Sequence, residues 1–428
     1  MSILLTMIFW ICSETGRNYM KTLPAHKQYS IFVGVMLSGY NLADKLYGAV
    51  YIVLMSMRGI DPLQISIVFA VSSLSLAIFD YPSGNLSDLF GRKKLTAIGF
   101  FTWGIGLCLF AFASNLMLFI VSAVIMSLGV ALISGSPQAW YIDKLDDLGM
   151  LDYKNVVLPR LNGFISAFAI VGAFLATVSS NVHLYLPVAI AGIVAIGLGI
   201  YAWFRFTDNY GERTEENIFK EVYNTSVDFA KNKLMRFILL KSIFSHAGLL
   251  AFLLTWQVYG VNELHMSVSY LGIILVVFMA VMSVSSFFVS YLAKRKVSPV
   301  KIITGGTLIS ALGLLLVGLF PNPVVFVGGL ILFEFGLAME SSCFGAWVQD
   351  FIPRSKRATF SSGLSALKSL AGFAITLVLG LLTERLGYSF IWYLGAASLL
   401  ISITVLIYLN AKHVRIGVNQ AEAEQPAL

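Results

Sequence analysis

The stretch GNLSDLFGRKK, residues 84–94, gathers one acidic and three basic side chains within a chain that is otherwise strongly apolar. Of the 428 residues, 58% are hydrophobic and only 12% are charged, about half the charged fraction of an ordinary soluble domain. Apolar runs of about 20 residues, the length that crosses the hydrocarbon core of a bilayer as a helix, flank the stretch on both sides. The stretch is therefore predicted to be a short polar loop between two membrane-spanning helices.

Outward from this loop, further apolar runs alternate with short polar breaks along most of the chain. They predict an all-α integral membrane protein with twelve transmembrane helices. The expected spans are residues 31–54, 63–87, 95–113, 116–142, 159–180, 184–205, 237–259, 267–292, 300–320, 324–349, 360–382 and 388–410.

The positions of the lysines and arginines predict the orientation in the membrane. Of the 29 Lys and Arg residues, 24 lie in the terminal segments, in the loops that follow even-numbered spans, or at the span ends that border these loops. The opposite loops hold two, Arg58 and Arg385, and three more lie within spans: Lys45, Lys241 and Lys368. Because cytoplasmic loops retain positive charge during insertion, both termini are expected on the cytoplasmic side. The membrane is expected to be the plasma membrane. This topology also accounts for the net charge of +7, so we draw no nucleic-acid inference from it.

The chain is predicted to be an internal duplication of six spans. AWYID, residues 139–143, ends the fourth span, and AWVQD, residues 346–350, ends the tenth. The spans that follow also align, with glycines 163 and 172 matching glycines 363 and 372. The expected segments are a cytoplasmic N-terminal segment (1–30), a first six-helix bundle (31–205), a cytoplasmic linker (206–236), a second six-helix bundle (237–410) and a cytoplasmic tail (411–428). For the segment before the first span, an interfacial apolar run and a translation start at Met20 are both left open.

The loop and the duplication together resemble the major facilitator superfamily. Its signature loop between spans two and three runs Gly, three residues, Asp, a basic residue, any residue, Gly, Arg, then Lys or Arg. The matching positions are Gly84, Asp88, Gly91, Arg92 and Lys93, while Leu89 stands where a basic residue is usual. IPRSKRAT, residues 352–359, is similar to the superfamily's loop between spans ten and eleven. The resemblance implies two six-helix bundles around a central cavity and secondary transport by alternating access.

The resemblance also implies a cytoplasmic gate at the signature loop. Asp88 can accept hydrogen bonds from Arg92 or from the amino end of a helix, which by resemblance is span eleven of the other half. Such a contact would hold the two halves together on the cytoplasmic side. Asp80, on the same helix, suits either the boundary between the halves or a pair with a nearby lysine. Lys93 is expected mainly to anchor the topology.

Ionisable side chains within spans mark candidate solute and proton sites, because each costs at least ~2.5 kcal/mol in the bilayer core. In the first span, polar residues recur at spacings of three and four and form one stripe. Asp44 and Lys45 are neighbours about 100° apart on the helix, which allows both to border one cavity without an ideal pair. Cavity lining is preferred here over a structural interhelical ion pair. The stripe comprises Ser38, Asn41, Asp44, Lys45, Gly48 and Tyr51.

In the second half, the candidates are Glu334 and Glu340 in span ten, Lys368 in span eleven and His246 in span seven. The two glutamates are six residues apart and cannot share a helix face, and Glu334, nearer to mid-span, is preferred for the cavity. His246 suits a hydrogen-bonded packing role and a proton-handling role about equally.

Catalytic motifs are missing from the sequence. The patterns GxxxxGK[ST], HExxH and GxSxG do not occur, so an enzyme, an ATP-driven pump, a cofactor and a metal site are not expected. We therefore expect a secondary transporter of a small-molecule solute, acting as a monomer and coupled to protons through Asp44 and Glu334. Efflux of amphiphilic compounds, uptake of a small organic ion or metabolite, and a non-transporting receptor of the same fold remain alternatives.

Overall fold

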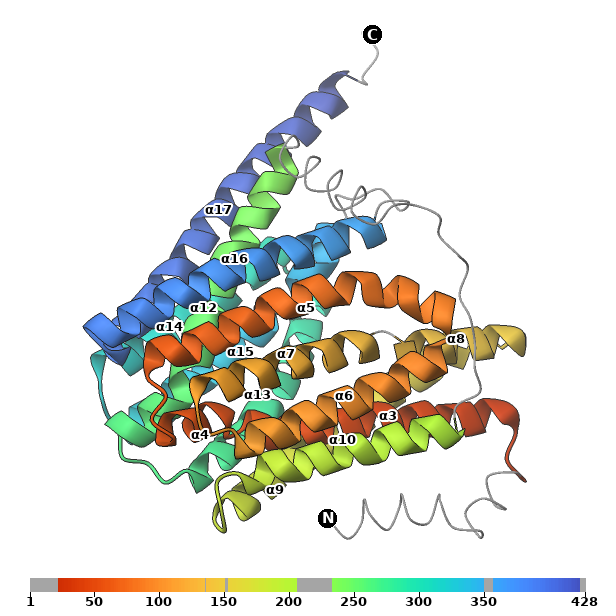
Figure 1. Cartoon of the computed structure of the whole chain (residues 1–428). Coiled ribbons are helices and arrows are strands. Elements are labelled where there is room, and N and C mark those ends of the chain that lie inside the picture. The colour runs from red at the N-terminus through yellow and green to blue at the C-terminus, as the bar shows by residue number, and fades with distance from the viewer. Residues whose placement is uncertain (1–21, 135, 151–152, 206–232, 350–356, 424–428) are drawn as a thin grey trace. The chain divides into compact units, whose positions relative to one another are not determined.

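The computed structural model describes residues 22–134, 136–150, 153–205, 233–349 and 357–423, and within this part of the chain it contains helices and no strand (Figure 1). The α-helices are, in chain order, α3 (Ala25–Gly48), α4 (Tyr51–Met57), α5 (Pro62–Phe90), α6 (Arg92–Phe112), α7 (Leu116–Ile133), α8 (Ser136–Asp147), α9 (Lys154–Ser180), α10 (Leu186–Arg205), α12 (Lys233–Val258), α13 (Ser269–Lys294), α14 (Pro299–Leu319), α15 (Pro323–Gln349), α16 (Arg357–Leu386) and α17 (Tyr388–Ala423). A π-helix, Tyr259–Glu263, continues α12.

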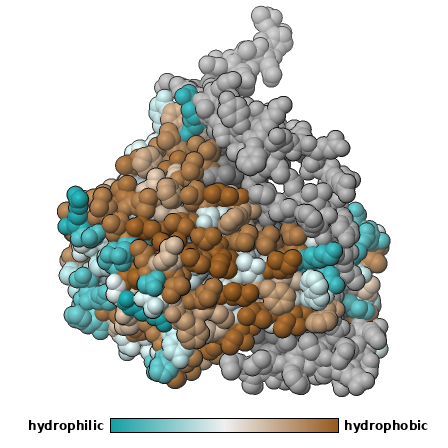
Figure 2. All heavy atoms as spheres, viewed as in Figure 1, coloured by the Kyte–Doolittle hydropathy of each residue, from teal (hydrophilic) through white to brown (hydrophobic). Residues whose placement is uncertain are grey.

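Ten helices in the described part of the chain are long and apolar enough to cross a membrane. Large apolar side chains cover their outer faces, as expected for contact with lipid: Val324 is 80% exposed and Phe287 is 78% exposed. Figure 2 shows hydrophobic residues over most of the visible face of these helices, with hydrophilic residues gathered towards helix ends. The prediction of an all-α integral membrane protein is confirmed, and the number of twelve spans stays a prediction.

The described residues form two units. One unit takes in residues of the ranges 1–54, 78–215 and 268–276, and the other takes in residues of 55–77, 216–267 and 277–428. In the first unit, α3 packs against α9 and α10, and α6 packs against α7 and α10. In the second, α14 packs against α15 and α17, and α12 packs against α16 and α17. The two predicted bundles, 31–205 and 237–410, stay a prediction.

Two of the expected spans are interrupted rather than continuous. The first, expected at 31–54, is divided between α3 and α4 just after Gly48, because glycine is a poor helix former. The fourth, expected at 116–142, is divided between α7 and α8: Ser134 leaves helical geometry with ψ 124°, and Pro137 falls in the first turn of α8, where proline is well tolerated. AWYID, residues 139–143, therefore lies on a separate short helix, α8.

A glycine lets two helices of each unit approach closely. A Cβ added at Gly172 of α9 would collide with the carbonyl oxygen of Leu42 in α3. A Cβ at Gly372 of α16 would lie 3.2 Å from Nε2 of His246 in α12. These glycines are one of the two pairs that the predicted duplication aligns, and each allows close packing in its own unit.

Candidate functional site

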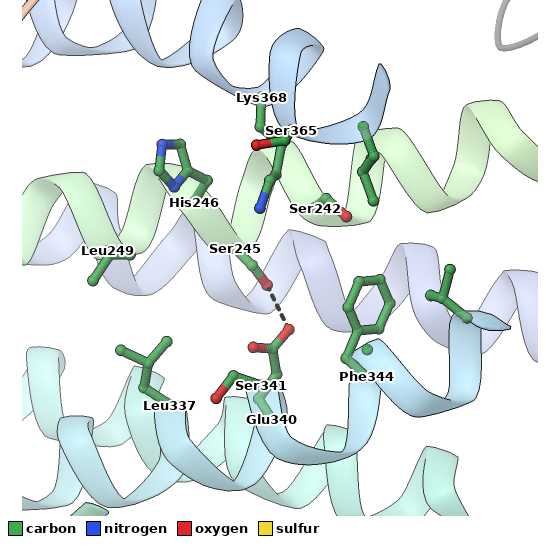
Figure 3. Close-up of a pocket in the computed structure, with 13 residues that line it drawn as sticks. Ser242, Ser245, His246, Leu249, Leu337, Glu340, Ser341, Phe344, Ser365 and Lys368 are labelled. Atoms are coloured by element: carbon green, nitrogen blue, oxygen red, sulfur yellow. Dashed lines mark hydrogen bonds between the residues drawn. The ribbon is translucent and has the colours of Figure 1, made fainter. Parts of the chain in front are cut away.

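The second unit contains a pocket of about 350 Å³ between α12, α15 and α16 (Figure 3). The lining positions on each helix recur at helical spacing, so each helix presents one face to the pocket. From α12 they are Ser242, Ser245, His246 and Leu249; from α15, Leu337, Glu340, Ser341, Phe344, Gly345 and Val348; and from α16, Leu364, Ser365 and Lys368. Three predicted site residues, His246, Glu340 and Lys368, are thus brought to one cavity.

A buried ion pair forms one wall of the pocket. Nζ of Lys241, on α12, pairs with Oε1 of Glu340, on α15, and the two side chains are only 1% and 10% exposed. The lysine also lies 3.8 Å from the ring centre of Phe344, in a cation–π contact. The Ser245 hydroxyl donates a hydrogen bond of 3.4 Å to the same carboxylate oxygen. The charge of Glu340 is therefore balanced inside the protein.

Hydroxyl groups connect this ion pair to α17. The hydroxyls of Ser245 and Ser402 lie 2.9 Å apart, and Ser402 donates to the backbone carbonyl of Lys241 at 3.3 Å. The Ser398 hydroxyl donates to the carbonyl of Phe244 at 2.7 Å. Because α17 thereby contacts the backbone of α12 at Lys241 and at Phe244, the side chains of Lys241 and Ser245 have a defined position.

The opposite wall of the pocket carries a second lysine. Lys368 and Ser365, three residues apart on one face of α16, point towards α12, and His246 lies beside them (Figure 3). Among the described residues, no carboxylate lies within ion-pair distance of Lys368. Lys368 lines the pocket and Lys241 lies buried behind Glu340, so with neutral histidine the lining and this buried partner together carry one net positive charge.

The lining of this pocket includes Glu340 and not Glu334, and the preference for Glu334 at a cavity between the two halves stays a prediction. Glu334 is buried, at 7% exposed, on another face of α15. On either side of it, Ser310 of α14 donates to the carbonyl of Phe333 at 2.9 Å, and Ser285 of α13 donates to that of Phe335 at 2.8 Å. This segment of α15 is therefore fixed by neighbouring helices of the same unit.

Sequence reasoning did not single out Lys241 as a site residue. The available signal was its charge within a span, shared with Lys45 and Lys368. Periodicity did not reveal its partner, because Glu340 lies 99 residues away in the chain.

The polar stripe of the first unit forms a local ion pair. Nζ of Lys45 lies 2.7 Å from Oδ2 of Asp44, and both side chains are 27% exposed. The two neighbours therefore do pair with each other, because the flexible lysine side chain bends back to the adjacent carboxylate. That they line a cavity stays a prediction. The Asn41 amide donates to the Leu37 carbonyl of the preceding turn at 2.9 Å.

Aromatic rings surround this second ion pair. The ring centre of Tyr40 lies 4.8 Å from that of Trp103, and Tyr47 lies 6.2 Å from Trp103 and 5.6 Å from Tyr51. The first unit thus has a partly accessible ion pair bordered by tyrosines. Within the described part of the chain, no cluster of three or more His, Cys, Asp or Glu side chains is arranged to hold a metal ion.

The polar loop predicted at residues 84–94 is helical except at Gly91, because α5 extends to Phe90 and α6 begins at Arg92. An ion pair links this stretch to a second sequence motif. Arg92, the first residue of α6, pairs with Asp143 of AWYID on α8. Gly91, just before it, has φ +97°, a backbone conformation that side chains other than glycine rarely adopt. Lys93 lies 5.7 Å from the ring centre of Trp203. The side chains of Asp80, Gly84 and Asp88 lie outside the described residues, so the gate they form with the other half stays a prediction.

The sequence profile of the Major Facilitator Superfamily matches residues 31–374 and 257–427. The chain belongs to this superfamily. A Bacillus subtilis (strain 168) protein described as the uncharacterized MFS-type transporter YxaM is 25% identical over 195 residues, which cover 45% of this chain and 47% of that protein. The chain thus aligns with about half the length of YxaM.

Two other superfamily members match over most of the chain. The uncharacterized MFS-type transporter MJ1560 of Methanocaldococcus jannaschii is 20% identical over 360 residues, 82% of this chain and 90% of that protein. The crystal structure of the nucleoside transporter NupG superposes with a TM-score of 0.74 at 13% identity, over 89% of this chain and 98% of that chain. At this identity the likeness shows the fold alone.

Proposed function

We propose that this chain is a secondary transporter that moves a small-molecule solute across the plasma membrane by alternating access, coupled to protons. The observation that carries the proposal is the pocket of the second unit, where His246, Glu340 and Lys368 meet between membrane helices and Glu340 pairs with the buried Lys241. Charged side chains inside a membrane protein persist where they pair or line a wet cavity, and they mark solute and proton pathways. Membership of the superfamily supports the same function.

Glu340 is the proposed proton carrier of this pocket. Its carboxylate is held charged by Lys241 and by the Ser245 hydroxyl. Protonation of Glu340 removes the partner of Lys241 and raises the net charge of the pocket by one. An arrangement that separates the pair favours proton uptake, because an isolated buried carboxylate is far more costly than a neutral acid. Asp44, paired with Lys45, is a second proposed carrier, and Glu334 is a third.

The pocket favours a small polar solute over a bulky amphiphile. Its volume of about 350 Å³ is at the lower end of the range for ligand pockets. Four serine hydroxyls and the ionisable groups line it. Of the two transport alternatives, the lining therefore supports the carrier of a small organic ion or metabolite. The proposal includes the orientation expected from the charge distribution, in which both termini are cytoplasmic.

The test is transport by purified protein in liposomes, screened with small organic ions and metabolites under an imposed pH gradient. Glu340→Gln is expected to abolish gradient-driven accumulation while solute exchange across the membrane persists. This split is expected because exchange needs the solute site but no net proton movement. Glu384→Gln, which removes an exposed carboxylate near the C-terminal end of α16 and away from the pocket, is the matched control and is expected to transport normally.

Each outcome of this assay decides one part of the proposal. Full accumulation of solute by Glu340→Gln would show that Glu340 is not the proton carrier. Loss of accumulation in Asp44→Asn alone would assign proton coupling to Asp44 of α3 instead. Failure of the wild-type protein to move any solute in the screen, with or without a gradient, would overturn the transport function.

A further inference from the structure

In the pocket of the second unit, the carboxylate acceptor already has hydrogen-bond partners, whereas several donors have none among the described residues. Its one carboxylate, Glu340, already accepts from Lys241 and Ser245. On the facing wall, Lys368, Ser365 and His246 have no hydrogen-bond or ion-pair partner among the described residues. Ser365 is exposed, but Lys368 and His246 are half-buried, and polar groups partly withdrawn from water need partners. The pocket therefore offers free donors and a free positive charge, while its acceptor is occupied.

The remaining serines of the pocket do not change this balance. Ser242 donates to the Ile238 carbonyl at 2.8 Å, and Ser341 donates to the Ala338 carbonyl at 3.3 Å. Each of these two hydroxyls thus donates its hydrogen bond to a backbone carbonyl of its own helix. The unused donors thus all lie at the α16 side of the pocket.

The position of His246 depends on a glycine. Because Gly372 has no side chain, α16 approaches the imidazole of His246 closely, with the site of an added Cβ only 3.2 Å from Nε2. Gly372 lies one helical turn beyond Lys368 on the same face of α16. His246 is thereby held beside the lysine, within one wall of the pocket.

From this arrangement we infer that the pocket receives an anionic group of the solute, with the Lys368 ammonium as its counter-charge and Ser365 and His246 as hydrogen-bond donors. The inference rests on the proposed transport function and names its substrate class: small organic anions. The Lys241–Glu340 pair keeps the other wall neutral, so that the charge of the carboxylate does not repel the solute. Protonation of Glu340 strengthens binding, because it frees the charge of Lys241. Solute and proton then favour each other's binding.

Thiol labelling tests the charge preference without knowledge of the solute. In a background with Cys12, Cys108 and Cys343 replaced by alanine, Ser365→Cys places a thiol on the pocket wall beside Lys368. Two methanethiosulfonate reagents of similar size are compared, one bearing a sulfonate and the other a trimethylammonium group. The ratio of their rates, divided by the same ratio for a free thiol in solution, reports the preference. Any effect of Lys368 on the reactivity of the thiol acts on both reagents and cancels.

We expect the normalised ratio to favour the sulfonate reagent by about tenfold, because a unit charge within a few ångströms acts through a poorly screened pocket. Lys368→Met or Lys368→Gln is expected to abolish the preference, and Lys368→Arg to retain it. Lys301→Met, which removes an exposed lysine of α14, is the matched control and is expected to leave the ratio unchanged.

Three results would overturn the inference: a ratio near that of the free thiol, a ratio that survives removal of the Lys368 charge, or no labelling of Ser365→Cys by either reagent. The last result would show that the pocket does not admit a solute of this size. Labelling does not depend on transport, so the two proposals can fail separately. If the liposome assay shows transport but labelling shows no charge preference, only the anion site is rejected. If labelling shows the preference but no solute is transported, only the proposed function is rejected.

Discussion

Lys241 is the most deeply buried charged side chain in the described part of the chain, with only 1% of it exposed. A charge at such depth in a membrane helix costs about 2.5–3.5 kcal/mol on insertion scales, so its surroundings must offset that cost. Glu340 supplies the opposite charge, and the ring of Phe344 adds a cation–π contact. The pair is thus one unit in energetic terms: each partner is tolerable only because of the other.

Removal of either partner is expected to destabilise the protein strongly. Lys241→Met or Glu340→Met leaves one buried charge without its partner, a loss of about 3–5 kcal/mol. The double variant is expected to recover most of this loss. The measurement is the thermal unfolding midpoint of each purified variant in detergent. If the double variant loses as much stability as the sum of the losses in the two single variants, the pairing is contradicted.

The control for this cycle is the other intramembrane pair. Asp44 and Lys45 are each 27% exposed, so solvent screens their attraction. Lys45→Met is expected to cost about 1 kcal/mol or less. The contrast between the two lysines separates an effect of burial from a general effect of charge removal.

At the scale of helices, small residues decide which elements come into close contact. Gly172 lets α9 approach the backbone of α3 at Leu42, and Gly372 lets α16 approach His246 of α12. The two glycines occupy equivalent positions of the duplication. The repeated feature is thus close approach of one helix to another, while the chemistry differs: a backbone carbonyl is met in one unit and an imidazole in the other.

Gly172→Val is expected to lower the thermal unfolding midpoint, with a cost of about 1–3 kcal/mol, because the added side chain forces α3 and α9 apart. Gly197→Val in α10 is the matched control, since nothing lies within 4 Å of a Cβ at that position. Equal destabilisation by both substitutions would show that loss of glycine, rather than the helix contact, is responsible.

For the whole molecule, the duplication relates two halves with different polar chemistry. The first unit carries a local pair between neighbours in sequence, bordered by tyrosines. The second carries a long-range pair and an additional lysine around a defined pocket. The first unit thus presents aromatic rings around an internally neutralised ion pair, and the second unit presents a pocket with a positive charge.

The orientation of the chain is predicted from its charge distribution. With 24 of 29 Lys and Arg residues in the termini and one set of loops, a fluorescent protein fused after the last residue is expected to fluoresce, and a phosphatase fused there to be inactive. The same reporters inserted in the loop after α4, near Arg58, are expected to give the opposite pattern. Phosphatase activity at the C-terminus would reverse the proposed topology.

The helical membrane fold could be predicted from the sequence because hydrophobic length is a local property. A run of apolar residues long enough to span the bilayer forms a helix wherever it stands, since every backbone polar group must be satisfied within it. The positions of most helices were therefore predicted to within a few residues. The break near Gly48 was not predicted, because the apolar run LYGAVYIVLM, residues 46–55, continues through it. The break near Ser134 was not predicted either, although residues 134–138, SGSPQ, contain the Gly and Pro that are typical of a helix break.

The pairing of charged side chains was decided only by the tertiary structure. A span carries charges on known faces, but which helix meets each face depends on contacts between segments far apart in the chain. Lys241 and Glu340 are 99 residues apart, and Arg92 and Asp143 are 51 apart. Composition and periodicity thus identified a membrane protein with charges in its spans. Helix packing determined that one carboxylate is neutralised and that Lys368 faces a pocket with its charge unmatched.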